Sequence, residues 1–76
     1  MADFKYEVKE VIGVISEGKS SKKELRLISW NDKPAKYDIR DWWIDKDGNE
    51  KMGKGITLTA EELVNIAELA KEIKGI

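Results

Sequence analysis

The sequence predicts an α+β domain of residues 1–76, in which a four-stranded twisted antiparallel sheet is followed by one C-terminal helix. Three observations lead to this prediction. Four segments of strand composition follow one another, turn-forming residues separate them, and helical periodicity is clear only at the end of the chain. A run of strands followed by a helix is typical of the α+β class.

The first strand is predicted at about 4–15. Phe4, Tyr6 and Val8 alternate with charged residues, which is the period of a strand with one wet face. Residues 11–15 are then apolar on both faces apart from Gly13. A glycine inside a strand predicts either a bulge or a close approach of another backbone.

The second and third strands are predicted at about 23–30 and 36–44, joined by a turn that contains Pro34. Period-two alternation divides their side chains between two faces. One face takes Arg26, Ile28, Trp30, Lys36, Asp38, Arg40 and Trp42. The other takes Leu25, Leu27, Tyr37, Ile39 and Trp43. Alternation predicts that Trp43 is buried with Ile39 and that Trp42 is exposed; a bulge near the end of the strand would reverse this.

The fourth strand is predicted at about 50–58, after a reversal at the Asp47-Gly48 pair. The helix is predicted at about 60–74, because Thr59 and Glu62 form a capping box. Gly75 is the predicted stop. An apolar stripe with helical spacing follows the cap: Leu63, Ile66, Ala67, Ala70 and Ile73.

The apolar surface of this helix has two interpretations. It is a wide core face for its own sheet, or it covers both that sheet and the helix of a partner. A 76-residue chain without cysteine or histidine has neither disulfides nor a zinc site to stabilise a small core. Chain length therefore favours a dimer.

Composition also limits the chemistry. Without cysteine or histidine there is no thiol nucleophile or imidazole base. Asp45, Asp47 and Glu50 cluster near a glycine but lack the remaining ligands of a calcium loop. We therefore expect no enzyme activity, no cofactor and no metal. No signal peptide or membrane span is visible, which indicates a cytoplasmic protein with no membrane partner.

The formal net charge is −1, but the charge is unevenly distributed along the chain. Residues 19–54 carry ten basic and seven acidic side chains, and the acidic excess lies at the two ends. Basic and aromatic residues interleave on the second and third strands, a combination that binds single-stranded nucleic acid by stacking and phosphate contact. The alternative is that the tryptophans form the core, and that Arg26 and Arg40 are solvated or paired with Asp38 or Glu24 across strands.

Two segments carry a resemblance to a known family. Residues 37–43 read Tyr-Asp-Ile-Arg-Asp-Trp-Trp, and residues 51–58 read Lys-Met-Gly-Lys-Gly-Ile-Thr-Leu. Together with the helix start at 59–62, they resemble the positive cofactor four family of transcriptional coactivators and their microbial relatives. The sequence departs from the family pattern in its fourth-strand motif, which has Met52 where a proline is common and one basic residue fewer.

The resemblance implies a homodimer whose helices pack together and whose sheets bind single-stranded DNA. It assigns Trp30 as the aromatic before the turn, Arg40 as the channel arginine and Trp43 as the stacking ring, whereas alternation favours Trp42. It leaves Lys33 and Lys36 as alternatives for the basic residue of the turn. The candidate nucleic-acid-binding residues are therefore Lys22, Arg26, Trp30, Lys33, Lys36, Arg40, Trp42, Trp43, Lys51 and Lys54.

The expected function is sequence-tolerant binding of single-stranded DNA, with RNA as the other candidate ligand. The expected process is transcription regulation, with the transcription machinery as a partner, or DNA replication or repair. The alternative function is a protein-interaction or dimerisation module that does not bind nucleic acid.

Overall fold

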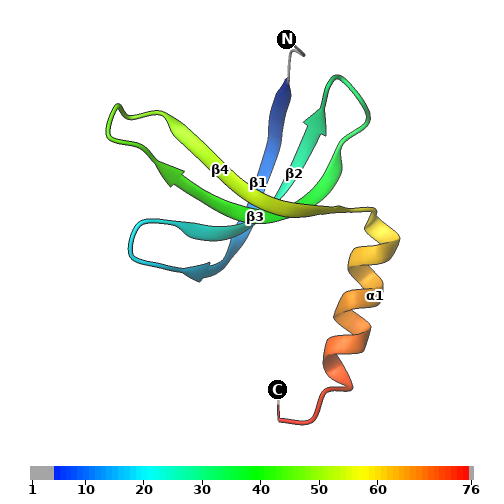
Figure 1. Cartoon of the computed structure of the whole chain (residues 1–76). Coiled ribbons are helices and arrows are strands. Elements are labelled where there is room, and N and C mark those ends of the chain that lie inside the picture. The colour runs from blue at the N-terminus through cyan, green and yellow to red at the C-terminus, as the bar shows by residue number, and fades with distance from the viewer. Residues whose placement is uncertain (1–4, 76) are drawn as a thin grey trace.

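A computed structural model describes residues 5–75 and confirms the α+β class: four antiparallel strands precede one helix (Figure 1). Phe4, which the sequence pattern assigned to the first strand, lies outside the described residues. The elements are β1 (Tyr6–Glu17), β2 (Lys22–Trp30), β3 (Lys36–Ile44), β4 (Glu50–Leu58) and α1 (Ala60–Lys71).

The strands follow one another across the sheet in the order β1-β2-β3-β4, and each neighbouring pair is antiparallel. The β1–β2 and β3–β4 hairpins therefore project from the same end of the sheet, where Figure 1 shows them diverging. The β2–β3 turn lies at the other end.

Strand β1 is irregular in its pairing with β2. Its register shifts at three places: between Val8 and Glu10, between Val11 and Gly13, and after Val14. One shift is beside Gly13, so the bulge is the correct alternative there. A Cβ at Gly13 would meet no atom within 4 Å, which argues against a close backbone approach.

Local polar contacts fix two turns. Asn31 and Asp32 both have positive φ, and the Lys33 N–H donates to the Trp30 carbonyl at 2.9 Å, as in a type I′ turn. In the β3–β4 hairpin, Asp45 Oδ1 accepts hydrogen bonds from two backbone N–H groups of its own turn. The Asp45 carboxylate therefore organises the turn.

The capping box of α1 is formed as predicted. Thr59 Oγ1 accepts from the Glu62 N–H at 3.1 Å, and Glu62 Oε1 accepts from the Thr59 N–H at 2.8 Å. The predicted end at residue 74 is wrong, because α1 ends at Lys71. Glu72 and the next residue donate to carbonyls three positions back, which tightens the last turn before Gly75 is reached.

The core is small, and α1 contributes little to it. Ile28, Trp42 and Leu58 are the buried apolar side chains within residues 5–75. None of the α1 residues is buried, and in the described chain the helix contacts only β3 and β4 (Figure 1). The interpretation of α1 as a wide core face for its own sheet is therefore wrong. No helix of residues 5–75 is long and apolar enough to cross a bilayer.

Candidate nucleic-acid interface

The register of β2 and β3 brings the two predicted arginines and Trp42 onto one face of the sheet. Directly paired residues of antiparallel strands point to the same side. Arg26 pairs with Asp38, Glu24 with Arg40, Lys22 with Trp42, and Ile28 with Lys36. We call this side, which carries Lys22, Glu24, Arg26, Ile28, Lys36, Asp38, Arg40 and Trp42, the arginine face.

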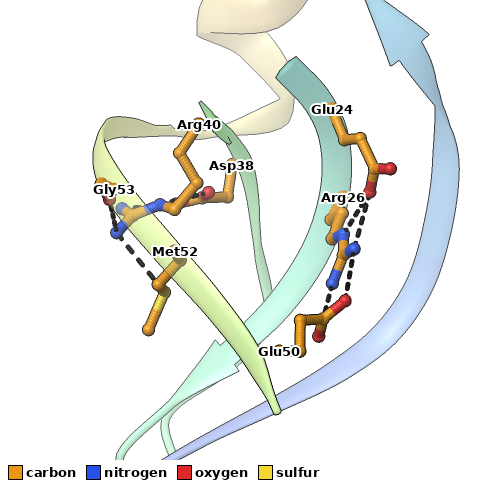
Figure 2. A network of polar contacts seen from close by, with 7 residues as sticks. All are labelled: Glu24, Arg26, Asp38, Arg40, Glu50, Met52 and Gly53. Carbon is orange, nitrogen blue, oxygen red and sulfur yellow. Dashed lines mark hydrogen bonds and ion pairs between the residues drawn. The ribbon is translucent and has the colours of Figure 1, made fainter. Parts of the chain in front are cut away.

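Arg26 is the centre of a buried ion-pair cluster on this face (Figure 2). Its Nε donates to Glu24 Oε1 at 2.7 Å, and its Nη1 and Nη2 reach the two carboxylate oxygens of Glu50 at 3.3 and 3.0 Å. Its Cζ lies 3.7 Å from the centre of the Trp42 ring. The Arg26 side chain is 6% exposed, so two carboxylates and an aromatic ring take the place of its water shell.

Burial and the two carboxylates act in opposite directions on Arg26. Desolvation by itself lowers the pKa of the guanidinium, but the hydrogen bonds and charges of Glu50 and Glu24 outweigh it and raise the pKa above its ordinary value. Arg26 is therefore a permanent cation, and the cluster of one arginine and two glutamates has an excess of negative charge.

Arg40 is held in a different way. Its Nε and Nη2 donate to the two oxygens of Asp38 at 2.6 and 2.8 Å, and Asp38 is completely buried. The remaining Nη1 makes longer contacts with Met52 Sδ at 3.7 Å and with the Gly53 carbonyl at 3.4 Å (Figure 2). Its Cζ lies 4.7 Å from the centre of the Trp30 ring.

Each arginine is thus paired with a carboxylate, as the alternative interpretation of the sequence anticipated. The partner is two residues earlier on the same strand, however, and not on the neighbouring strand. Residues i and i+2 of a strand share a face, which explains this geometry.

The predicted exposure of the tryptophan pair is reversed. Trp42 is 3% exposed, whereas Trp43 is only partly buried. Alternation shows which residues share a face, but it does not show which face is covered. Here the Arg26 guanidinium covers Trp42, and the Tyr6 ring lies 5.9 Å away, centre to centre. The buried indole N–H of Trp42 has no hydrogen-bond partner in the described chain.

Gly55 provides the space that Arg40 occupies. A Cβ at Gly55 would overlap Cβ of Arg40 and the carbonyl oxygen of Ile39, and would lie 2.8 Å from Arg40 Nε. The β3–β4 register also shifts between Arg40 and Trp42. The glycine of the Lys-Gly-Ile segment therefore allows two backbones to approach beneath the arginine.

Two hollows lie near these arginines. The Trp30 hollow, of about 340 Å³, is lined by Trp30, Lys33, Pro34, Lys36, Arg40 and Thr57. The Trp43 hollow, of about 530 Å³, is formed by the 18–22 loop and by Glu24, Arg26, Trp42, Trp43, Ile44 and Glu50. The first lies at the β2–β3 turn, and the second lies between the two diverging hairpins.

The predicted lysines are all exposed, but they do not form one group. Lys33 and Lys36 line the Trp30 hollow, and Lys22 lines the Trp43 hollow. Lys51 pairs instead with Asp45 at 3.9 Å. Lys54 lies between Gly53 and Gly55 and lines neither hollow. Within residues 5–75, no group of three acidic side chains is arranged to hold a metal ion.

The sequence interpretation missed one important member of the interface. Glu50 begins β4 yet pairs with Arg26 on β2, a strand that is not its neighbour in the sheet (Figure 2). No local pattern signals a contact between strands that are not neighbours. In contrast, Glu24 and Asp38 lie two residues before the arginines that they bind, so their spacing was a usable signal.

Comparisons with known proteins agree with the resemblance in the sequence. The family model described as Transcriptional Coactivator p15 (PC4) matches residues 18–69, which is more than half of the chain. An "Uncharacterized protein" of Treponema pallidum (strain Nichols) is 50% identical over 68 residues, which cover 88% of this chain and 76% of that relative. The segment that matches the family model includes both arginines and the residues that line the two hollows.

Proposed function

Because the chain belongs to the PC4 family of transcriptional coactivators, we propose that it binds single-stranded DNA with little sequence preference. The two hollows receive bases and phosphates along the arginine face. Binding of this kind serves transcription regulation or DNA replication and repair in the cytoplasm, with the transcription machinery as a further partner.

The observation that carries this proposal is the composition of the Trp30 hollow. A partly exposed indole lies beside the Arg40 guanidinium, and both are flanked by Lys33 and Lys36. Neither lysine has an ion-pair partner among the described residues. Bases stack on aromatic and guanidinium planes, and lysines follow the phosphates, without any need for a particular base.

Exposure supports Trp43 over Trp42 as the second stacking ring. Trp42 is buried under Arg26, so a base cannot reach its face without displacing the guanidinium. Trp43 is partly exposed and lines the Trp43 hollow beside the 18–22 loop. Trp30 also lies beside an arginine and the Tyr6 ring, but unlike Trp42 it is partly exposed. We therefore assign base contacts to Trp43 and to the exposed part of Trp30, and we assign to Trp42 the support of Arg26.

We also propose a homodimer formed through α1. The helix has no buried residue, and Val64, Ile66 and Leu69 are between 45% and 63% exposed. Exposed apolar surface of this extent on a small chain indicates a protein interface. A second copy of α1 would cover it and would hold two arginine faces in one molecule.

The test is a titration of a labelled oligothymidine with the protein, followed by fluorescence anisotropy at several salt concentrations. A duplex of equal length is the comparison. Lys33→Gln/Lys36→Gln is the informative variant, because both side chains are exposed and unpaired and their replacement leaves the core intact. Lys74→Gln removes an exposed lysine outside the hollows and is the control.

We expect preference for the single strand and weaker binding as salt rises. The double variant should also have a lower salt dependence, by about 0.7 in the log–log slope for each phosphate that it no longer neutralises. If the wild-type protein does not bind at micromolar concentration, the proposal is wrong and a protein-interaction module remains. If the double variant and Lys74→Gln weaken binding equally, the Trp30 hollow is not the site.

A further inference from the structure

The two arginines of the interface differ in whether their carboxylate partner can leave. Asp38 has no exposed surface, so its pair with Arg40 is a fixed part of the core. Glu50 is 41% exposed and is the first residue of β4, directly after the hairpin turn. A side chain in that position can rotate into solvent without disturbing the strand pairing.

Arg26 consequently has an inner and an outer partner. Glu24, whose side chain is 11% exposed, binds Nε and Nη2 and stays in place when Glu50 moves. Glu50 binds the outer edge, with one oxygen on each terminal nitrogen. A phosphate group binds arginine in this same two-pronged geometry.

The surroundings of this outer edge also suit a phosphate. Arg26 and Glu50 both line the Trp43 hollow, together with Lys19 of the β1–β2 loop and Lys22 at the start of β2. Neither lysine has an ion-pair partner within residues 5–75. If Glu50 withdrew, the hollow would present one guanidinium, two ammonium groups and the single carboxylate of Glu24 beside Trp43.

We propose that Glu50 is a displaceable carboxylate that occupies a phosphate site on Arg26. This inference rests on the proposed function, and it deepens that function by naming the step that opens the Trp43 hollow. A strand phosphate must exchange with Glu50 to reach Arg26, so the carboxylate weakens binding of the strand. Trp42 and Glu24 hold the guanidinium in place during the exchange.

Glu50→Gln tests this exchange, with Asp47→Asn as its matched control. Both remove one negative charge from the same hairpin, but the exposed Asp47 side chain makes no contact with Arg26. In the oligothymidine titration we expect Glu50→Gln to tighten binding by about fivefold, the upper range for a partly exposed ion pair. Asp47→Asn should leave binding close to that of the wild type. Circular dichroism checks that both variants are folded.

A second readout does not depend on DNA. The Arg26 Nε–H resonance is followed by NMR while inorganic pyrophosphate is added to the wild-type protein and to Glu50→Gln. The signal should move at a lower pyrophosphate concentration in the variant. This result would support the exchange even if no variant bound oligothymidine, in which case only the proposed function would fail.

Three results would overturn the inference. If both substitutions tightened oligothymidine binding equally, the loss of one negative charge would explain the effect without any exchange at Arg26. Weaker binding by Glu50→Gln would mean that Glu50 positions Arg26 for the ligand. An Arg26 resonance that responds to pyrophosphate identically in both proteins would show that Glu50 does not occupy the phosphate position.

Discussion

At the scale of single residues, the arginine face is organised by carboxylates that are as important as the cations. Arg26 and Arg40 each lie over a tryptophan ring and are each bound by a glutamate or an aspartate. Because these groups are buried or nearly so, the charges fix the positions of the side chains more than they attract distant anions. The attraction of distant anions comes instead from the unpaired lysines at the rims of the two hollows.

Asp38→Ala should destabilise the fold strongly. The substitution leaves the Arg40 guanidinium, which is 15% exposed, without its two short hydrogen bonds. Breaking a buried pair from one side costs about 3–5 kcal/mol. Urea unfolding at a fixed protein concentration measures the change.

The control for this prediction is Asp32→Asn, which removes an exposed pair with Lys5. Its effect should be less than about 1 kcal/mol, and asparagine accepts the positive φ of this position. Equal effects of the two substitutions would contradict the structural role given to Asp38.

At the scale of elements, the close contact between β3 and β4 depends on glycine, which has no side chain, at position 55. Gly55→Ala places a Cβ against the Ile39 carbonyl, and a backbone atom cannot move aside as a flexible side chain can. We expect a decrease in stability of about 2 kcal/mol or more, the range for overpacking a close contact. We also expect Arg40 to be displaced, with weaker oligothymidine binding.

Gly13→Ala is the matched substitution in β1, where a Cβ meets no atom within 4 Å. It should change stability by no more than about 1 kcal/mol in either direction. Thermal unfolding compares the two. If Gly55→Ala lowers stability no more than Gly13→Ala does, the close approach of the two backbones beneath Arg40 is not required.

Most of the element order could be predicted from the sequence, because its signals are local. The strand alternation, the Asp-Gly reversal and the Thr59–Glu62 cap each act over a few residues, and the structure contains all of them. The parts that were wrong depend on tertiary contacts. The burial of Trp42 and the contact between Glu50 and Arg26 arise where side chains meet across strands.

At the scale of the whole molecule, a single chain leaves many large apolar side chains of residues 5–75 exposed. The helix projects from the sheet (Figure 1), and β1 separately carries four exposed apolar residues: Val11, Ile12, Val14 and Ile15. The small core of residues 5–75, with four buried polar side chains, gives limited stability to a chain of this length. Association of two chains would bury part of this exposed apolar surface and so add to stability.

Leu69→Lys should therefore convert the proposed dimer into a monomer. Leu69 is 63% exposed in the single chain, so the substitution removes little packing within it. Sedimentation over a range of concentrations gives the association state. Asn65→Lys adds the same charge to the same helix on its polar side and should leave association unchanged. A monomeric wild-type protein at high concentration would contradict the proposal.

Amide and indole NMR shifts during an oligothymidine titration test the central claim most directly, because they report where the strand lies. We predict that the largest shifts occur at the Trp30 and Trp43 indoles and in the backbone at residues 18–22 and 33–36. The polar side of α1 should be unaffected. Shifts confined to α1, or no shifts at a ligand excess, would contradict the assignment of the two hollows as the nucleic-acid interface.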